Sequence, residues 1–142
     1  RLRRLEPAPR PGQPRCRMLA TVGPLGRGAA AGLVRRLAAS SVFPWAGKAF
    51  QPDDPRKGLG INRIRLGGER RWFPFEYRQA DSAVDGRPCV VLDYERDENP
   101  WFIQAIHDEV REVAPGLYLG PAMAKLPRGK ALVLYFALDF NT

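Results

Sequence analysis

The chain has 142 residues, of which 44% are hydrophobic and 10% aromatic, a composition that excludes a wholly disordered protein and fits one globular domain with a tail. The net charge of +8 is unevenly placed, because residues 1–48 hold ten Lys/Arg and one Glu, whereas residues 49–142 hold thirteen Lys/Arg and fourteen Asp/Glu. A nucleic-acid module carries its positive charge on a folded face. A near-neutral body behind a basic, Pro-rich beginning therefore argues against nucleic acid as a partner.

The first third of the chain divides into two segments. Residues 1–17 contain four prolines and six arginines and predict a disordered basic arm. Residues 18–40 are predicted to be a short helical segment, in which Leu33, Val34 and Leu37 form one apolar face. The apolar run at residues 19–34 is interrupted by Arg27 and is too short to span a bilayer. Residues 41–142 are predicted to form a single β-barrel-like domain.

Within this domain, strand patterns follow one another and are separated by turn residues. Alternating or aromatic-rich runs predict strands at residues 61–66, 71–78, 88–95, 117–124 and 131–138. Gly67-Gly68 and Asp85-Gly86 predict turns, and Pro74 indicates an edge strand or a bulge. The predicted fold class is therefore mainly β, an antiparallel small β-barrel.

One amphipathic helix is predicted to interrupt the strands at about residues 100–113. Asn99 is a suitable N-cap and Pro100 a suitable first helical residue. Apolar residues recur at i, i+4, i+8 and i+11 along one stripe, namely Phe102, Ile106, Val110 and Val113. Pro115-Gly116 ends the pattern. We expect this helix to pack on an open end or face of the barrel.

The segment F-P-W-A-G-K-A-F at residues 43–50 resembles the W-x-G-K-x-F opening of small bacterial lipocalin-like barrels, the GXWXG-type domains of unknown function. A later stretch from Ile106 to Arg111 is similar to their I-x-D-x-x-R pattern. The Asp93-Tyr94 pair and Pro100 match the strand end and the proline before that pattern, with Asp and Tyr in swapped order. The first Gly of the opening motif is absent here. The resemblance covers about half the chain and implies a closed or nearly closed lipocalin-like barrel with an internal pocket, but no activity.

The opening motif also has a direct physical interpretation. Trp45 is expected to seal one end of the barrel or to lie in its core. Lys48 is expected either to cap that end, through cation–π contact or hydrogen bonds to strand ends, or to lie in solvent.

Four titratable side chains are candidates for acid–base catalysis: Asp93, His107, Asp108 and Tyr118. Asp93 shares a strand face with Cys89 and Val91, so it is either a buried carboxyl with a raised pKa or a strand-end carboxylate paired with Arg63, Arg65 or Arg111. His107, the only histidine, is either a general base or a half-exposed helical residue. Asp108 with Arg111 and Tyr118 either holds a polar substrate or pins the helix across the barrel mouth. A lone histidine does not make a usual zinc site, so no metal and no cofactor are expected.

The favoured hypothesis is a soluble protein that binds a small, mostly apolar molecule inside the barrel. The expected ligand-binding residues are Phe73, Phe75, Tyr77, Val91, Arg111, Tyr118 and Tyr135, with Asp93 as a second polar anchor beside Arg111. A cofactor-independent hydratase, isomerase or cyclase that uses a buried Asp with Tyr or His is an alternative, and an interaction module using the basic arm is another. Two distant cysteines, Cys16 and Cys89, predict free thiols and a cytoplasmic location. No membrane span is expected, and a homodimer is left open.

Overall fold

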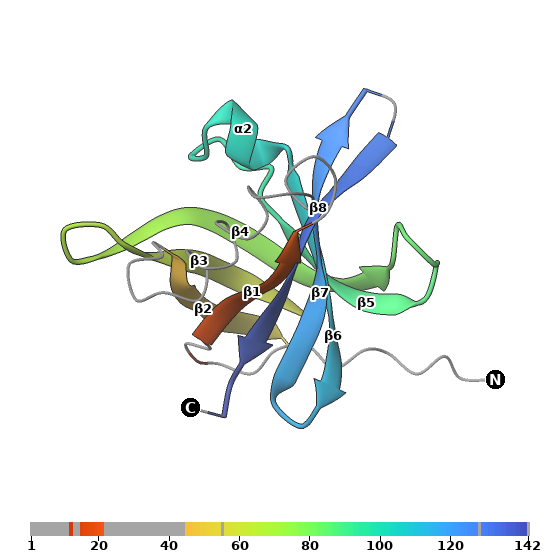
Figure 1. The fold of residues 1–142 in the computed structure, drawn as a ribbon, viewed down its shortest axis with the longest axis horizontal. Helices are drawn as coiled ribbons and strands as arrows, with labels where there is room; N and C mark the ends of the chain where they lie inside the picture. Colours follow the sequence, from red (N-terminus) through yellow and green to blue (C-terminus); the bar gives the residue numbers. More distant parts are fainter. Residues whose placement is uncertain (1–11, 13–14, 22–44, 55, 128, 142) are drawn as a thin grey trace.

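The fold is described from a computed structural model that describes residue 12 and residues 15–21, 45–54, 56–127 and 129–141. These residues form eight strands and one four-residue helix (Figure 1). The strands are β1 (Arg15–Thr21), β2 (Trp45–Asp54), β3 (Lys57–Arg65), β4 (Glu69–Asp81), β5 (Pro88–Asp93), β6 (Ile106–Ala114), β7 (Leu117–Leu126) and β8 (Gly129–Asp139), and the helix is α2 (Trp101–Gln104). The prediction of a mainly β, antiparallel fold is confirmed.

All pairings between neighbouring strands are antiparallel and follow chain order from β2 to β8. Strand β1 pairs with both β8 and β2, so the ladder closes on itself as a barrel. The two sides of β1 differ, because six residue pairs join it to β8 and one pair, Arg15 with Gly47, joins it to β2. The seam between β1 and β2 is therefore the thinnest part of the ring.

Strand β1 does not fit the predicted division of the N-terminal third. It takes residues 15–17 from the predicted disordered arm and residues 18–21 from the predicted helical segment. The correction has a tertiary cause, since the edge of β8 supplies the backbone partners that a Pro-rich, basic stretch lacks on its own. The predicted helix with Leu33, Val34 and Leu37 lies outside the described residues.

The two predicted turns are found where the sequence places them. Gly67 and Gly68 join β3 to β4 with φ values of 63° and 110°, and Gly86 has a φ of 70° between β4 and β5. The bulge indicated by Pro74 is also present. The ladder between β3 and β4 shifts between Ile61 and Asn62, so Phe73 is the extra residue on β4, and its φ is 58°.

The predicted amphipathic helix over residues 100–113 is wrong. A single helical turn, α2, ends at Gln104, and residues 106–114 form β6 between β5 and β7. A spacing of four residues fits a helix and a strand equally well, because four is a multiple of the strand period of two. Ile106 and Val110 therefore share an inner strand face, while Val113, which the helical stripe would bury, is 57% exposed.

Asn99 and the Pro115-Gly116 pair also have other roles than the sequence predicted. Asn99 does not cap α2, whose N-cap is Pro100 without a side-chain hydrogen bond. Instead its Nδ2 donates to the carbonyl oxygens of Pro74 and Tyr94, which ties the loop before α2 to β4. Pro115-Gly116 forms the turn between β6 and β7 rather than a helix end.

The core fills the inner face of the strands with aromatic and aliphatic side chains. Its buried members are Phe50, Phe75, Tyr77, Val90, Leu92, Tyr94, Ile103, Val110, Tyr118, Phe136 and Leu138. Glycines on β3 make room for the rings. A Cβ on Gly60 would overlap the ring of Phe75, and one on Gly58 would overlap Tyr77. In Figure 1, α2 and the β7–β8 hairpin lie at the same end of the molecule, where the Lys125 N–H donates to the Ala105 carbonyl oxygen.

Candidate functional site

Four polar side chains meet on the inner face of the sheet, in the middle of this apolar core. They are Lys48 on β2, Asn62 on β3, Tyr94 directly after β5, and Asp108 on β6, and we call them the Lys48 cluster. Each is between 2% and 4% exposed. The register explains why Asp108 points inward, since it pairs with Leu92, which in turn pairs with the buried Tyr77.

The Lys48 cluster is a connected hydrogen-bond network. Lys48 Nζ donates to Asn62 Oδ1 at 2.7 Å and to the Tyr94 hydroxyl at 2.6 Å. The Tyr94 hydroxyl donates to Asp108 Oδ2 at 3.2 Å, and Lys48 Nζ lies 3.8 Å from the same oxygen. Asn62 Nδ2 donates to the carbonyl oxygen of Phe73 at 2.9 Å. The network is thus anchored on the β4 bulge and spans from β2 to β6.

Aromatic rings surround the ammonium group of Lys48. Its Nζ lies 5.4 Å from the ring centre of Phe75, 5.3 Å from that of Tyr94 and 5.6 Å from that of Phe136. The negative faces of such rings attract a cation within about 6 Å. The expectation of a solvated lysine is therefore wrong. The expected cation–π contact is present, but it is made to core rings and not as a cap at the barrel end. The side chain of Trp45 lies outside the described part of the chain.

Asp108 is the acidic member of the Lys48 cluster. Burial raises the pKa of its carboxyl, although the charges of Lys48 and His107 and the hydrogen bond from Tyr94 act in the opposite direction. Its Oδ2 accepts the hydrogen bond from Tyr94, whereas its Oδ1 is buried and has no hydrogen-bond partner among the residues that the structure describes. An unpartnered carboxylate oxygen in an interior is costly, so it calls for an explanation.

The predicted ligand-binding residues divide between the two faces of the sheet. Phe75, Tyr77 and Tyr118 are buried in the core, and Phe73 packs against it. Val91 is buried but lies on the opposite face of β5 from Leu92, and Tyr135 is 39% exposed. Arg111 also points outward. Phe73, Phe75, Tyr77 and Tyr118 therefore lie on the inner side, as expected. Placing Val91, Arg111 and Tyr135 there is wrong, because each has the other strand parity.

The same parity corrects Asp93, which is not an interior acid. It pairs with Arg78, whose Nη1 donates to Asp93 Oδ2 at 3.2 Å. Burial acts to raise the pKa of Asp93, but the hydrogen bonds from the Glu95 N–H and from Arg78 outweigh it and lower that pKa. The expectation that this strand-end carboxylate pairs with an arginine is confirmed, but the expected partners Arg63, Arg65 and Arg111 are wrong. The partner is Arg78, which the sequence did not single out.

His107 and Tyr118 lie apart from each other and do not form an acid–base pair with Asp108. His107 is on the outer face of β6, where its Nε2 lies 3.0 Å from Glu109 Oε1. Its side chain is 14% exposed, so the predicted half-exposed helical residue is instead a mostly buried strand residue. Tyr118 is a core residue of β7 whose ring packs edge-on against Phe140 at 5.6 Å. Of the four candidate catalytic residues, Asp108 alone belongs to the Lys48 cluster.

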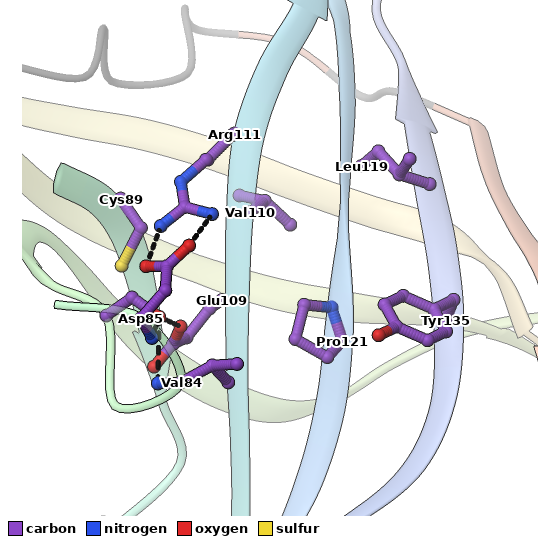
Figure 2. Close-up of a pocket in the computed structure, with 10 residues that line it drawn as sticks. Val84, Asp85, Cys89, Glu109, Val110, Arg111, Leu119, Pro121 and Tyr135 are labelled. Carbon is purple, nitrogen blue, oxygen red and sulfur yellow. Dashed lines mark hydrogen bonds and ion pairs between the residues drawn. The ribbon is translucent and has the colours of Figure 1, made fainter. Parts of the chain in front are cut away.

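A separate pocket of about 220 Å³ lies on the outer side of the sheet, beside the β4–β5 loop (Figure 2). Arg111 makes a two-pronged ion pair there with Asp85, at 3.0 and 2.6 Å. The hydrogen bond from Arg111 lowers the pKa of Asp85 to about 2. Arg111 is therefore committed to fixing the loop rather than to holding a ligand or pinning a helix.

Glu109 has a similar structural role in the outer pocket. Its carboxylate accepts hydrogen bonds from the Ser82 hydroxyl at 2.5 Å and from the Ala83 N–H at 2.7 Å. Burial, together with the charge of Glu109, raises the pKa of the neighbouring Cys89 thiol to about 12, so this thiol is not a nucleophile at neutral pH. An adjoining groove of about 490 Å³ is bordered by Met123, Leu132 and Tyr135, among others. Glu109 and Arg111 thus hold the β4–β5 loop on the sheet.

Within the described ranges, no group of three or more His, Cys, Asp and Glu residues is placed to hold a metal ion. The helix that the described residues contain is too short to cross a membrane.

Comparisons with known proteins bear on the fold. A crystal structure of a protein from Thermomonospora curvata is similar to this chain with a TM-score of 0.53 and 23% sequence identity, over 98% of this chain and 82% of that one. At this level of identity the likeness concerns the fold alone. No protein-family model matches the chain, and no curated protein matches it.

Asp108 is the member of the Lys48 cluster that the sequence proposed as a site residue. Lys48 was expected only to cap the barrel end or to lie in solvent, and Asn62 and Tyr94 were not proposed. The available signal for Tyr94 was its alternation with Val90 and Leu92 on one strand face. For Asn62 it was an amide next to Ile61 in an otherwise apolar alternation. Neither signal points to a lysine 14 or 46 residues away, which is the separation that the hydrogen bonds span.

Proposed function

We propose that this protein is a small-molecule-binding β-barrel of the lipocalin-like kind, which holds a mostly apolar ligand in its interior against the Lys48 cluster. The observation that carries the proposal is a buried lysine, aspartate, tyrosine and asparagine inside an aromatic core. One carboxylate oxygen there, Asp108 Oδ1, has no hydrogen-bond partner within the described residues. Such a group marks the position at which the polar atom of a ligand would bind.

Stability alone does not account for the Lys48 cluster. Each buried ion costs several kcal/mol of desolvation, and replacing a buried ion pair by apolar residues of similar volume is often neutral or stabilising. A buried carboxyl with a raised pKa, held beside a lysine and a tyrosine, is typical of functional sites. The rings of Phe73, Phe75, Tyr77 and Tyr118 would supply the apolar contacts of the ligand.

The first test is native mass spectrometry of the protein as purified from cells, followed by binding titrations with a panel of small apolar compounds. We expect a retained or added compound to bind to the wild type, and Asp108→Asn to weaken that binding by at least about tenfold. Asp93→Asn is the matched control, because it makes the same chemical change on the outer face. Equal binding by both variants, or no bound compound in either experiment, would refute the proposal.

A cofactor-independent enzyme is the second candidate, favoured by the position of the Tyr94 hydroxyl between a cation and a carboxylate. It accepts a hydrogen bond from Lys48 and donates one to Asp108. A group so placed can give a proton to a bound substrate, while the ammonium stabilises the resulting phenolate and Asp108 accepts or returns a proton. Isomerisation is the simplest reaction of this class, because it needs no co-reactant.

The enzyme candidate is tested by following the mass and the isomeric form of the bound compound over time. Tyr94→Phe is expected to stop conversion while binding persists, since it removes the hydroxyl and keeps the ring. A compound that is bound but recovered unchanged after long incubation with the wild type leaves binding as the function and rules out conversion of that compound.

A further inference from the structure

We infer that the interior site selects a neutral ligand that donates a hydrogen bond, an alcohol or a phenol, and that Asp108 Oδ1 accepts that bond. This inference rests on the proposed function and names the chemical class of its ligand. It is contrary to the first expectation for a buried lysine, which is that it binds an acid.

The donors of the Lys48 cluster are already engaged by the protein. Lys48 Nζ donates to Asn62 Oδ1 at 2.7 Å and to the Tyr94 hydroxyl at 2.6 Å, and its remaining hydrogen-bonding capacity lies beside Asp108 Oδ2 at 3.8 Å. Asn62 Nδ2 donates to the Phe73 carbonyl oxygen at 2.9 Å and approaches the Tyr94 hydroxyl at 3.4 Å. The Tyr94 proton goes to Asp108. A ligand acceptor would therefore have to displace an existing bond.

The hydrogen-bond acceptors of the Lys48 cluster, unlike its donors, are not all engaged. The carboxylate of Asp108 has room for about four hydrogen bonds, and its side chain is 5% exposed. Oδ2 accepts from Tyr94, whereas Oδ1 accepts from no group in the described part of the chain. The open hydrogen-bonding capacity of the cluster is thus that of an acceptor, and it calls for a donor.

Charge decides between the possible donors and against acids. Lys48 and Asp108 carry opposite charges 3.8 Å apart, so together they are close to neutral. A ligand carboxylate would add an uncompensated negative charge beside Asp108 in a water-poor interior, and a ligand ammonium would add a positive one beside Lys48; both are costly there. A hydroxyl supplies the missing proton without adding charge.

The experiment uses three probes of one shape, 2-naphthol, 2-methoxynaphthalene and 2-naphthoate, titrated into the full-length protein by calorimetry at neutral pH. We expect 2-naphthol to bind about ten- to a hundredfold more tightly than 2-methoxynaphthalene, the range for one hydrogen bond to a charged acceptor. We expect 2-naphthoate to bind least well. Asp108→Asn should reduce the preference for the hydroxyl, and Asp93→Asn should leave it unchanged.

The probes separate the failure of this inference from that of the proposed function. If 2-methoxynaphthalene binds as tightly as 2-naphthol, or 2-naphthoate binds most tightly, the inference is overturned while ligand binding stands. If the folded wild type binds none of the three and retains no compound from cells, the proposed function fails and the inference fails with it. The comparison of probes on the wild type alone is decisive, so it does not depend on the folding of any variant.

Discussion

Replacing Lys48 and Asp108 together by apolar residues of similar size, in the variant Lys48→Met/Asp108→Leu, is expected to stabilise the protein. Both side chains are almost completely buried, so each gives up several kcal/mol of hydration on folding. Unit charges 3.8 Å apart attract by about 4 kcal/mol at an effective dielectric constant of about 20. This attraction does not offset two desolvation penalties, and we expect the double variant to gain about 1–4 kcal/mol.

Each single replacement should have the opposite effect. Lys48→Met leaves a buried carboxylate without its cation, and Asp108→Leu leaves a buried ammonium without its anion. Removing one partner of a buried pair typically costs about 3–5 kcal/mol. The sign of the effect therefore reverses between the single variants and the double variant, which a generally disruptive substitution would not produce.

Urea unfolding followed by tryptophan fluorescence measures all four proteins of this double-mutant cycle. Burial raises the folded-state pKa of Asp108 above its ordinary value of 3.8. The free-energy cost of the buried Asp108 charge is therefore absent at low pH, and it appears as the pH rises from about 3.8 to the raised folded-state pKa. The gain of the double variant should accordingly be larger at pH 7 than at pH 3. A double variant less stable than either single variant would refute the reasoning, because it would show that the pair stabilises the fold.

Three further predictions follow from other parts of the molecule. Hydrogen bonds from His107, Ser82 and Ala83 outweigh burial and lower the pKa of Glu109 below its ordinary 4.5. The ionised Glu109 carboxylate therefore stabilises the folded protein above pH 4.5, and this stabilisation is lost as the pH falls. Glu109→Gln should accordingly make the urea midpoint fall less steeply below pH 4.5. Gly120→Ala should cost about 3 kcal/mol or more, because its Cβ would overlap the backbone carbonyl of Glu109, whereas Gly67→Ala, with open space around it, should cost only about 1–2 kcal/mol for its positive φ; equal losses would contradict the packing. In a Cys16→Ser background, Cys89 should resist Ellman's reagent until urea unfolds the protein, since the thiol is 1% exposed and its pKa is raised to about 12; reaction in the native state would show that the outer pocket opens.

Binding of the three naphthalene probes to the Lys48→Met/Asp108→Leu variant complements the double-mutant cycle of stability. If the double variant is more stable and no longer distinguishes 2-naphthol from 2-methoxynaphthalene, the polar groups are maintained at the expense of stability for the sake of binding. A more stable double variant that binds all three probes like the wild type would separate the Lys48 cluster from ligand selection.

The misassigned segment at residues 100–113 shows where local pattern loses its power. Phe102, Ile106 and Val110 recur every four residues, and this spacing places them on one face of a helix and equally on one face of a strand. Residues 106–114 form a strand rather than a helix because β5 and β7 supply backbone hydrogen-bond partners on both sides. A short-range signal contains no information about those edges.

The position of the site depended on one further decision that is not local. Alternation along β5 separates Asp93 from Tyr94, but it does not say which of the two faces is enclosed. The register with β4 and β6 puts Leu92 and Asp108 on the same side as Tyr77, and so turns Tyr94 inward and Asp93 outward. A shift by one residue would exchange the two sets.

The sequence by itself determined the mainly β character, the hairpin turns and the concentration of charge in the first third, because each depends on residues close together in the chain. At Pro74 it left an edge strand and a bulge open, and the pairing of β3 with β4 decided for the bulge. The tertiary structure alone decided that Lys48, Asn62, Tyr94 and Asp108 share one buried network, since those residues belong to separate strands and meet only through the order and register of the sheet. The chemistry of a barrel interior is set by which face closes inward, and that is a property of the whole sheet.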